Sequence, residues 1–379
     1  MAAESPIGTL QTHFEGVEDP RVDYLVDHVL LEIIIVAICA VICGANDWVA
    51  VESWGKMKIE WLTQFLDFKN GIPSHYTFRR VFARIDPEQF QAGFTAWTQA
   101  VFSVSQGQVI AVDGKQMKGS KCKRLGKKAI CMVSAWATKN QITLGQVKAE
   151  EKSNEISAIP ELLELLNVKG CLVTIDAAGS QKKNTEIIID QEGDYLLAVK
   201  GNQGHLQEDV IALFDHAHEQ EFKGIDADYE RSVASGHGRL EIRECWAIDD
   251  EQQLDFLRHR EEWKKLQSIV MIRSMRQEGN KTTVKDNYFI SSLEADAKRI
   301  LNAKRAHWGI ENGLHWVLDV AFQEDRHQLH GNGAANMAVL RHMALSLLKQ
   351  DKTTKMGVHN KRLKAAWDED YLLRVLRPS

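Results

Sequence analysis

Two aspartates stand at the ends of apolar, β-branched stretches of the sequence. The run Gln108-Val-Ile-Ala-Val-Asp113 ends in an acid followed by Gly114, and the run Cys171-Leu-Val-Thr-Ile-Asp176 ends in an acid followed by small residues. Short runs of this composition are typical of buried strands. Ligands of open α/β sheets bind beyond the carboxyl ends of the strands, so two acids delivered to that edge predict a site.

A third acid, Glu311, lies in a segment whose apolar periodicity predicts a helix over residues 303–322. It is three residues after Trp308, three before Leu314 and seven before Leu318, which predicts that it faces the core. A carboxylate in such a position is costly unless it is paired or bound to a cation. A lone buried ion pair is the ordinary explanation for Glu311 by itself. Together with the two strand-end aspartates, a pocket of three carboxylates is the better interpretation.

Three carboxylates in one crevice repel one another unless cations hold them together. Hard oxygen ligands without a thiolate favour Mg²⁺ or Mn²⁺. Two such ions can activate a water or a DNA 3′-hydroxyl and stabilise the leaving oxygen of an in-line phosphoryl displacement. The sequence therefore predicts chemistry on phosphodiesters, with Asp113, Asp176 and Glu311 as catalytic and metal-binding residues.

An alternative metal site uses the histidines of the same helix. His307, Glu311 and His315 are spaced i, i+4 and i+8, and could chelate zinc on one helix face. This alternative leaves Asp113 and Asp176 without a role, and the sequence lacks the His-Glu-x-x-His spacing of metalloproteases. The histidines can instead position phosphate or Glu311 itself.

Basic side chains close to these acids are candidates for DNA contact. The stretch from Lys115 to Lys128 has seven basic residues and no acid, and it leaves directly from Asp113. Such a stretch can neutralise phosphates, although a solvated hairpin tip has the same composition. Lys200 ends a predicted strand beside the second aspartate strand, where a phosphate contact and a plain turn are equally good explanations. The predicted DNA-contacting residues are Lys115, Lys118, Lys121, Arg79, Arg80, Lys200, His307 and His315.

The elements that position these residues follow the order βββαβαβα. Three meander strands followed by two crossovers form the order of the ribonuclease H-like fold, and a right-handed crossover places the first and fourth strands side by side. The predicted strands are 108–113, 130–138, 141–148, 171–176 and 194–199, and the predicted helices are 154–166, 181–190 and 206–216.

Four regions are expected along the chain. An N-terminal helical, DNA-binding domain covers residues 1–105, the catalytic core covers 106–223 and 293–349, a β-rich insertion covers 224–292, and a basic tail covers 350–379. In the helical domain, Ser74 is a predicted N-cap and Asp86-Pro87 a predicted helix boundary. The segment Ser74 to Arg80 could be a recognition helix; an amphipathic helix with solvated arginines is the alternative that we favour.

Composition limits the class of protein. An apolar share of 44% over 379 residues is enough for a real core. The longest apolar run, Val29 to Cys43, contains Glu32 and is too short to span a bilayer, and the N-terminus lacks the apolar segment of a signal peptide. Six scattered cysteines without a Cys-x-x-Cys pair fit a reducing cytoplasm. We expect a cytoplasmic protein without membrane association, on the nucleoid when bound to DNA.

The short motifs along the chain form a specific set. They are Val112-Asp-Gly-Lys115 with Gly119-Ser120, Leu144-Gly-Gln146, Glu151-Lys-Ser-Asn-Glu-Ile156, Thr174-Ile-Asp-Ala177 with Gln181, Lys200-Gly-Asn-Gln203, His307-Trp-x-Ile-Glu-Asn312, Leu314-His-Trp316, Leu318-Asp319 and Phe322-x-Glu-Asp325, with Gly71-Ile-Pro-Ser-His75 and Arg80-Val-Phe82 in the helical segment. With these motifs the chain resembles the H-repeat-associated insertion-sequence transposases of bacteria over nearly its whole length.

The resemblance implies a DDE transposase with a ribonuclease H-like catalytic domain and a β-rich insertion. It maps the catalytic triad onto Asp113, Asp176 and Glu311, and it implies two Mg²⁺ or Mn²⁺ ions. The implied partners are double-stranded DNA, as terminal inverted repeats and target DNA, and a second copy of the chain in a homodimer on paired DNA ends. A metal-dependent nuclease that cuts without joining, and a DNA-binding derivative with a dead core, are the alternatives.

The chain departs from related transposases on the glutamate helix. That helix carries Tyr-x2-Arg-x3-Glu-x6-Lys in those relatives, and the flanking places here are Lys304, His307 and Leu318. The resemblance implies that His307 substitutes for the arginine as a phosphate contact, and it assigns no residue to the role of the lysine. Lys118 also stands where an arginine is expected, which exchanges a bidentate donor for a point charge.

Overall fold

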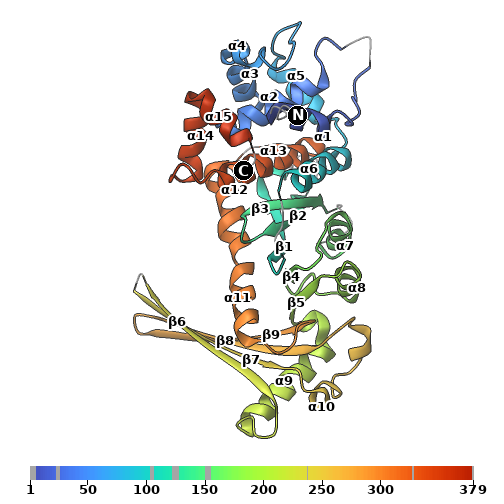
Figure 1. The fold of residues 1–379 in the computed structure, drawn as a ribbon, viewed down its shortest axis with the longest axis vertical. Helices are drawn as coiled ribbons and strands as arrows, with labels where there is room; N and C mark the ends of the chain where they lie inside the picture. The colour runs from blue at the N-terminus through green and yellow to red at the C-terminus, as the bar shows by residue number, and fades with distance from the viewer. Residues whose placement is uncertain are drawn as a thin grey trace. The chain divides into compact units, whose positions relative to one another are not determined.

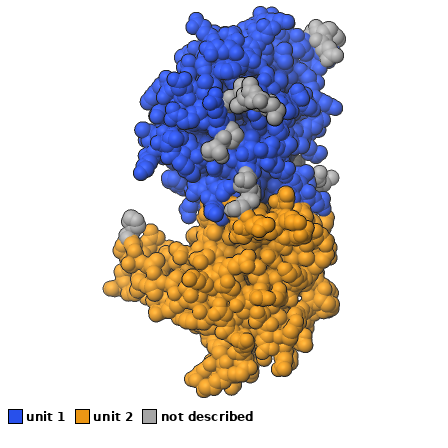
Figure 2. Space-filling view, in the orientation of Figure 1, with its two compact units in different colours: residues 1–104, 114–166, 310–379 blue, residues 105–113, 167–309 orange. Residues whose placement is uncertain are grey.

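The computed structural model describes residues 6–22, 26–102, 106–121, 128–149, 155–236, 238–326 and 328–377. The chain divides into two compact units. The first consists of residues 1–104, 114–166 and 310–379, and the second of residues 105–113 and 167–309 (Figure 2). The four predicted domains divide the chain differently and stay a prediction.

The protein is a mixed α/β structure. Among the described residues, nine strands form a mixed sheet with the order β3-β2-β1-β4-β5-β9-β8-β7-β6 (Figure 1). Their bounds are β1 (Val109–Met117), β2 (Ile130–Ala137), β3 (Ile142–Lys148), β4 (Leu172–Ile175), β5 (Asp194–Val199), β6 (Ala227–Gly236), β7 (Arg239–Ile248), β8 (Ser268–Glu278) and β9 (Lys281–Ser291).

The first unit is mainly helical, and its core is built on two buried helices. Helix α2 is apolar apart from Glu32, is buried along nearly its whole length and packs against α13, which is also buried along most of its length. The helices of this unit are α1 (Pro6–Phe14), α2 (Leu30–Ile42), α3 (Trp48–Met57), α4 (Ile59–Leu62), α5 (His75–Phe82), α6 (Pro87–Val101), α7 (Glu155–Leu165), α12 (Trp316–Ala321), α13 (Asn332–Gln350), α14 (Val358–Trp367) and α15 (Glu369–Leu376).

Helix α5 follows the sequence prediction closely. The Ser74 side chain accepts a hydrogen bond from the amide of Thr77, so the predicted N-cap is confirmed. Phe78, Val81 and Phe82 are buried, whereas Arg79 and Arg80 are exposed. The amphipathic interpretation is therefore confirmed, and DNA contact by the two arginines stays a prediction. The predicted start at Pro87 is also confirmed, because Pro87 opens α6 with Asp86 as its cap.

In the second unit, parallel pairing joins β1 to β4 and β4 to β5. The predicted placement of the first and fourth strands side by side is thus confirmed. The strands of residues 224–292 extend the same sheet, since β9 pairs antiparallel with β5, and β8, β7 and β6 follow in an antiparallel ribbon. The helices of this unit are α8 (Lys182–Asp190), α9 (Gly204–Glu219), α10 (Glu251–Leu254) and α11 (Ala297–His307).

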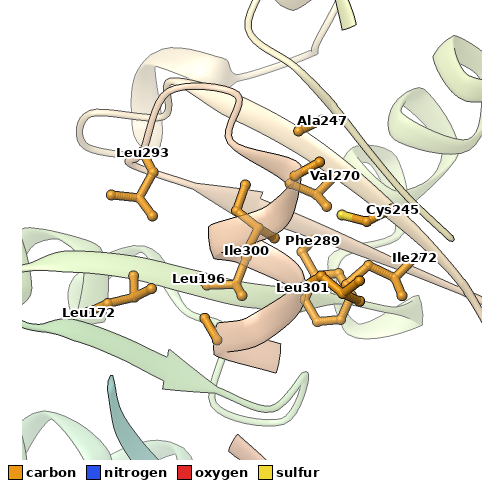
Figure 3. Close-up of a cluster of buried hydrophobic side chains, with 12 residues drawn as sticks. Leu172, Leu196, Cys245, Ala247, Val270, Ile272, Phe289, Leu293, Ile300 and Leu301 are labelled. Atoms are coloured by element: carbon orange, nitrogen blue, oxygen red, sulfur yellow. The ribbon is translucent and has the colours of Figure 1, made fainter. Parts of the chain in front are cut away.

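Helix α11 packs on the sheet of the second unit through an apolar cluster. Ile300 and Leu301 of the helix meet residues of five strands, β4, β5, β7, β8 and β9 (Figure 3). This contact holds the C-terminal turn of α11, which ends at His307, in a fixed place on the sheet. Within the described residues, no helix combines the length and the apolar character needed to cross a membrane.

Candidate active-site residues

Asp113 and Asp176 each come directly after one member of a register pair between two neighbouring strands. Val112 of β1 is in register with Ile175 of β4, and the strands are parallel. Each aspartate is the next residue along its chain, so both follow directly on the last register pair between β1 and β4. Both side chains are partly exposed. Asp176 follows the end of β4, as the sequence predicts, but the prediction that a strand ends at Asp113 is wrong, because β1 continues to Met117 beyond its last pair with β4.

The turn after Asp176 is held by side chains that the sequence reasoning did not assign. The Asp176 carboxylate accepts a hydrogen bond of 3.3 Å from the amide of Gly179. Asn202 donates to the carbonyl of Ala177 at 2.6 Å, and Gln203 donates to the carbonyl of Ser180 at 3.0 Å. The motif Lys200-Gly-Asn-Gln203 thus braces the turn that carries Asp176. In the sequence, the amide side chains of Asn202 and Gln203 are the only signal that this motif supports the turn.

His307 lies against the aspartate strands. A hydrogen bond of 2.9 Å joins its Nδ1 to the hydroxyl of Thr174, two residues before Asp176. Burial lowers the pKa of His307 below its ordinary value, and the nearby charge of Asp176 opposes this shift only in part. A neutral ring is therefore favoured at pH 7. Such a ring can hydrogen-bond to a phosphate, but it does not replace the permanent charge of an arginine.

A cavity of about 770 Å³ opens beside these residues within the second unit. Its lining includes Asp176, His307 and Lys200. Lys200 is exposed, which fits its predicted role as a phosphate contact. The structure brings together in one cavity three of the residues predicted from the sequence.

The first unit carries Glu311, and here the prediction of its orientation is wrong. Glu311 is 62% exposed and Trp308 is 61% exposed, although both were expected on the apolar face, whereas Leu314 and Leu318 are fully buried. The physical reason is a π-helical turn over Glu311–His315. Such a turn holds one more residue than an α-helical turn, so residue spacing no longer gives the facing side. Glu311 and His315 still lie close enough to share an ion, but His307 is not in their group among the described residues, so the predicted zinc site keeps two of its three ligands.

His315 is buried beside Glu311. It is 8% exposed, and its Nδ1 lies 3.7 Å from a Glu311 carboxylate oxygen. Burial is the main cause that lowers the pKa of His315 to about 4; the charge of Glu311 acts in the opposite direction. The predicted DNA contact of His315 does not fit a buried, neutral ring. Its position fits a residue that orients Glu311.

Lys115 is enclosed by carboxylates of the first unit. Its ammonium lies 2.5 Å from Asp319 and 2.7 Å from Glu324, and the side chain is only 12% exposed. Burial alone would lower the pKa of Lys115, but the charges of Glu324 and Asp319 outweigh it and raise the pKa. Its predicted contact with DNA phosphate does not fit this placement, because its charge is already balanced.

The remaining part of the predicted basic stretch is more open. Lys118 is 81% exposed, and its ammonium lies 3.5 Å from Asp325. Lys121 is exposed as well. Residues 122–127 lie outside the described residues. Lys118, Lys121 and Lys128 are therefore the described lysines of this stretch whose exposed position suits contact with DNA.

Two family models match the sequence. One, described as DDE_Tnp_1-associated, matches residues 11–98, and the other, described as Transposase DDE domain, matches residues 104–348. Similar proteins include "Putative transposase YncI" of Escherichia coli O157:H7, which is 41% identical over 98% of this chain and 95% of its own length. "H repeat-associated putative transposase YhhI" of Escherichia coli strain K12 is 40% identical over 98% of both chains.

One solved structure resembles the chain at a distance. It is a piggyBac transposase synaptic complex with hairpin DNA, with 9% sequence identity and a TM-score of 0.45 over 98% of this chain and 81% of that chain. A likeness at this level carries no conclusion about the chemistry of the site.

Proposed function

This chain belongs to the DDE transposase family and is a transposase, and from that premise we propose that Asp113, Asp176 and Glu311 are its metal-binding triad. The proposed reaction is cleavage of DNA followed by strand transfer. The proposed cofactor is a pair of Mg²⁺ or Mn²⁺ ions. The family implies a divalent metal, and its identity is inferred from the ligands, which are all carboxylates.

One observation carries this proposal. Asp113 and Asp176 directly follow the register pair Val112 and Ile175 on adjacent parallel strands. Two carboxylates that follow one register pair on adjacent strands repel each other, and divalent cations relieve this repulsion. The strand order β3-β2-β1-β4-β5, with its parallel pairs at β1, β4 and β5, also supports the proposed ribonuclease H-like core.

Glu311 is proposed as the third ligand on two grounds. It is the acid of the motif His307-Trp-x-Ile-Glu-Asn312, and its carboxylate is exposed and therefore accessible to an ion. It also stands only two residues after Gly309, the last residue of the second unit. Because consecutive Cα atoms are about 3.8 Å apart, the chain itself keeps Glu311 close to the unit that carries both aspartates.

The bound ions would activate the attacking hydroxyl and stabilise the leaving oxygen. The protein residues hold the ligands in place. Asn202 and Gln203 fix the turn after Asp176, His307 holds Thr174 on the aspartate strand, and His315 orients Glu311. Lys200, Lys118 and Lys121 are proposed to contact DNA phosphates, as are Arg79, Arg80 and the neutral His307.

The proposed partners are the terminal inverted repeats of the element, target DNA and a second copy of the chain. Joining of two DNA ends requires that both be held together, which supports a homodimer on paired ends. The names of the relatives favour a transposase over a nuclease that only cuts. Detection of joined products, in addition to cut ones, distinguishes these two activities.

The test is a cleavage assay on duplexes that carry the inverted repeats flanking the gene, with Mg²⁺ and purified full-length chain. Asp176→Asn and Asp113→Asn should each lower the cleavage rate at least about a hundredfold, since metal ions supply several kcal/mol to such reactions. Asp190→Asn is the matched control, because Asp190 lies at the far end of α8 in an exposed ion pair with Lys264. Cleavage by Asp176→Asn at the control rate would remove Asp176 from the mechanism.

A further inference from the structure

The C-terminal segment of the chain carries a buried arginine that contacts two other helices. Helices α14 and α15 follow α13 in the sequence and belong to the first unit (Figure 1). Arg362 of α14 is only 2% exposed, and among the described residues no carboxylate lies within ion-pair distance of it. Burial is the main cause that lowers the pKa of Arg362 to about 9, so the guanidinium is still charged at pH 7. A buried charge is costly unless other groups compensate it.

Backbone carbonyls at the ends of two helices compensate this charge. The Arg362 guanidinium donates to the carbonyl of Val41 at 2.9 Å and to that of Ala45 at 3.1 Å, at the C-terminal end of α2. It also donates to the carbonyl of Ala321, the last residue of α12. The final carbonyls of a helix lack partners within the helix and carry its partial negative charge. One cation therefore joins the ends of α2 and α12.

These contacts use the shape of an arginine side chain. The Nε atom and both terminal nitrogens of Arg362 donate hydrogen bonds, and Nη2 donates a further one of 3.0 Å to the Asn46 side chain. The central carbon of the guanidinium lies 4.0 Å from the centre of the Phe322 ring, next to the end of α12. A lysine keeps the charge but has a single nitrogen, so it cannot contact both helix ends in this way.

Helix α12 leads directly from the π-helical turn that begins at Glu311. The turn continues into α12 without a break, and Ala321 is ten residues after Glu311. At about 1.5 Å per residue, this helical segment is a rod of about 15 Å. Lys115 holds the rod at Asp319, and Arg362 holds its end. Because the rod is short, a shift of its end also moves the turn that exposes the Glu311 carboxylate.

We propose that Arg362 is a positioning residue for Glu311, so that the C-terminal segment is part of the scaffold of the proposed metal site. The guanidinium fixes the end of α12 to α2, a helix in the core of the first unit. Helix α12 in turn fixes the orientation of the glutamate. The effect on metal binding and cleavage rests on the proposed function of Glu311, whereas the hold of Arg362 on α12 does not.

Hydrogen–deuterium exchange of the full-length chain, without DNA or metal, tests the hold on α12. Arg362→Lys should speed the exchange of amides in residues 311–321 about tenfold, the factor expected for the loss of one hydrogen bond to a charged group. Arg374→Lys is the matched control, because Arg374 is exposed on α15 of the same segment. Leu372→Ala is the control for stability, because it removes a fully buried side chain of α15 and leaves the guanidinium in place. Both controls should exchange like the unaltered chain in residues 311–321.

Two further measurements test the effect on Glu311. Binding of Mn²⁺ alone is followed by electron paramagnetic resonance of the free ion, and the cleavage assay gives the maximal rate and the KM for DNA. Arg362→Lys should weaken Mn²⁺ binding and lower the maximal rate about tenfold, the lower end of the effect of removing a group that supports a metal ligand. The KM for DNA should stay unchanged, because a side chain that is 2% exposed does not contact DNA. Arg374→Lys and Leu372→Ala should change none of these values.

A second variant keeps the inference testable if Arg362→Lys does not fold. Phe322→Leu keeps an apolar side chain beside the guanidinium but removes the ring face. It should change the exchange of residues 311–321 and the binding of Mn²⁺ in the same direction, by about threefold. Thermal unfolding of each variant checks that the fold persists.

Two results would overturn the proposal. One is exchange in residues 311–321 that neither Arg362→Lys nor Phe322→Leu changes. The other is an equal loss of Mn²⁺ binding in Leu372→Ala, which would show that general destabilisation is the cause. Mn²⁺ binding and cleavage that survive Glu311→Gln would instead refute the proposed function of Glu311 and leave the hold of Arg362 on α12 standing.

Discussion

Replacing Lys115 by methionine is expected to destabilise the first unit. The Lys115 ammonium lies between Asp319 and Glu324, and the Glu324 side chain is only 2% exposed. Removing one partner of a buried ion pair costs about 3–5 kcal/mol, because the other charge is left without compensation in a medium of low dielectric. Arg341 still lies 3.7 Å from Glu324, so we expect the lower end of this range, about 3 kcal/mol.

The assay is thermal unfolding followed by near-ultraviolet circular dichroism. A loss of about 3 kcal/mol corresponds to a Tm lower by about 6–12 °C in a domain of this size. Lys118→Met is the matched control, because Lys118 is 81% exposed and its ion pair with Asp325 contributes at most about 1 kcal/mol. The double variant Lys115→Met with Glu324→Gln should recover part of the loss, since it removes both charges.

One result would refute this reasoning. If Lys115→Met unfolds at the same temperature as Lys118→Met but binds DNA less tightly, the charge of Lys115 serves DNA, as the sequence alone suggested. The structure instead predicts that Lys115→Met lowers the unfolding temperature strongly, and that variants of Glu324 lower it as well.

Two further predictions concern burial. His342 is 3% exposed, and burial is the main cause that lowers its pKa from 6.5 to about 3. Between these two pKa values the unfolded chain binds a proton at His342 that the native chain does not bind. The free energy of unfolding therefore falls as the pH falls through this window. His342→Gln should reduce the loss of unfolding free energy between pH 6.5 and 5 by about 2 kcal/mol in urea titrations, and an unchanged loss would show that other groups cause it. Ile300 is fully buried in the cluster under α11. Ile300→Ala should cost about 2–5 kcal/mol in the same titrations, and a cost below 1 kcal/mol would show that the helix is held by other contacts.

The strands around the aspartates could be predicted from the sequence because they are continuous apolar runs. The predicted strand 194–199 has the bounds of β5, and the predicted neighbours β1 and β4 pair in parallel. The partner of β9 could not be predicted. Its residues show only that a strand exists, and the pairing of β9 with β5 depends on long-range contacts that leave no local pattern.

Charged residues were harder to place than strands. Lys115 and Lys118 belong to one basic stretch of the sequence, yet the first is enclosed by carboxylates and the second is exposed. Their different roles depend on Asp319 and Glu324, which lie about 200 residues further along the chain. The composition of this stretch shows its positive charge but does not show which acids will lie beside each lysine in the folded chain. The sequence therefore identifies a basic stretch and cannot say which of its lysines remain available to DNA.

Glu311 shows that regular helical spacing can predict the wrong orientation for a proposed site residue. Regular helical spacing placed it in the core, where the cost of burial argued for a bound cation. The π-helical turn over Glu311–His315 instead exposes the glutamate and buries the histidine. A regular α-helix would place these two residues, four apart, on the same face. The extra residue in the turn exposes the Glu311 carboxylate and keeps the neutral His315 imidazole buried beside it. A metal ligand and the residue that orients it require such an arrangement. Glu311 is therefore a candidate metal ligand because an ion can reach it and because of its motif, and not because burial of its charge would be costly.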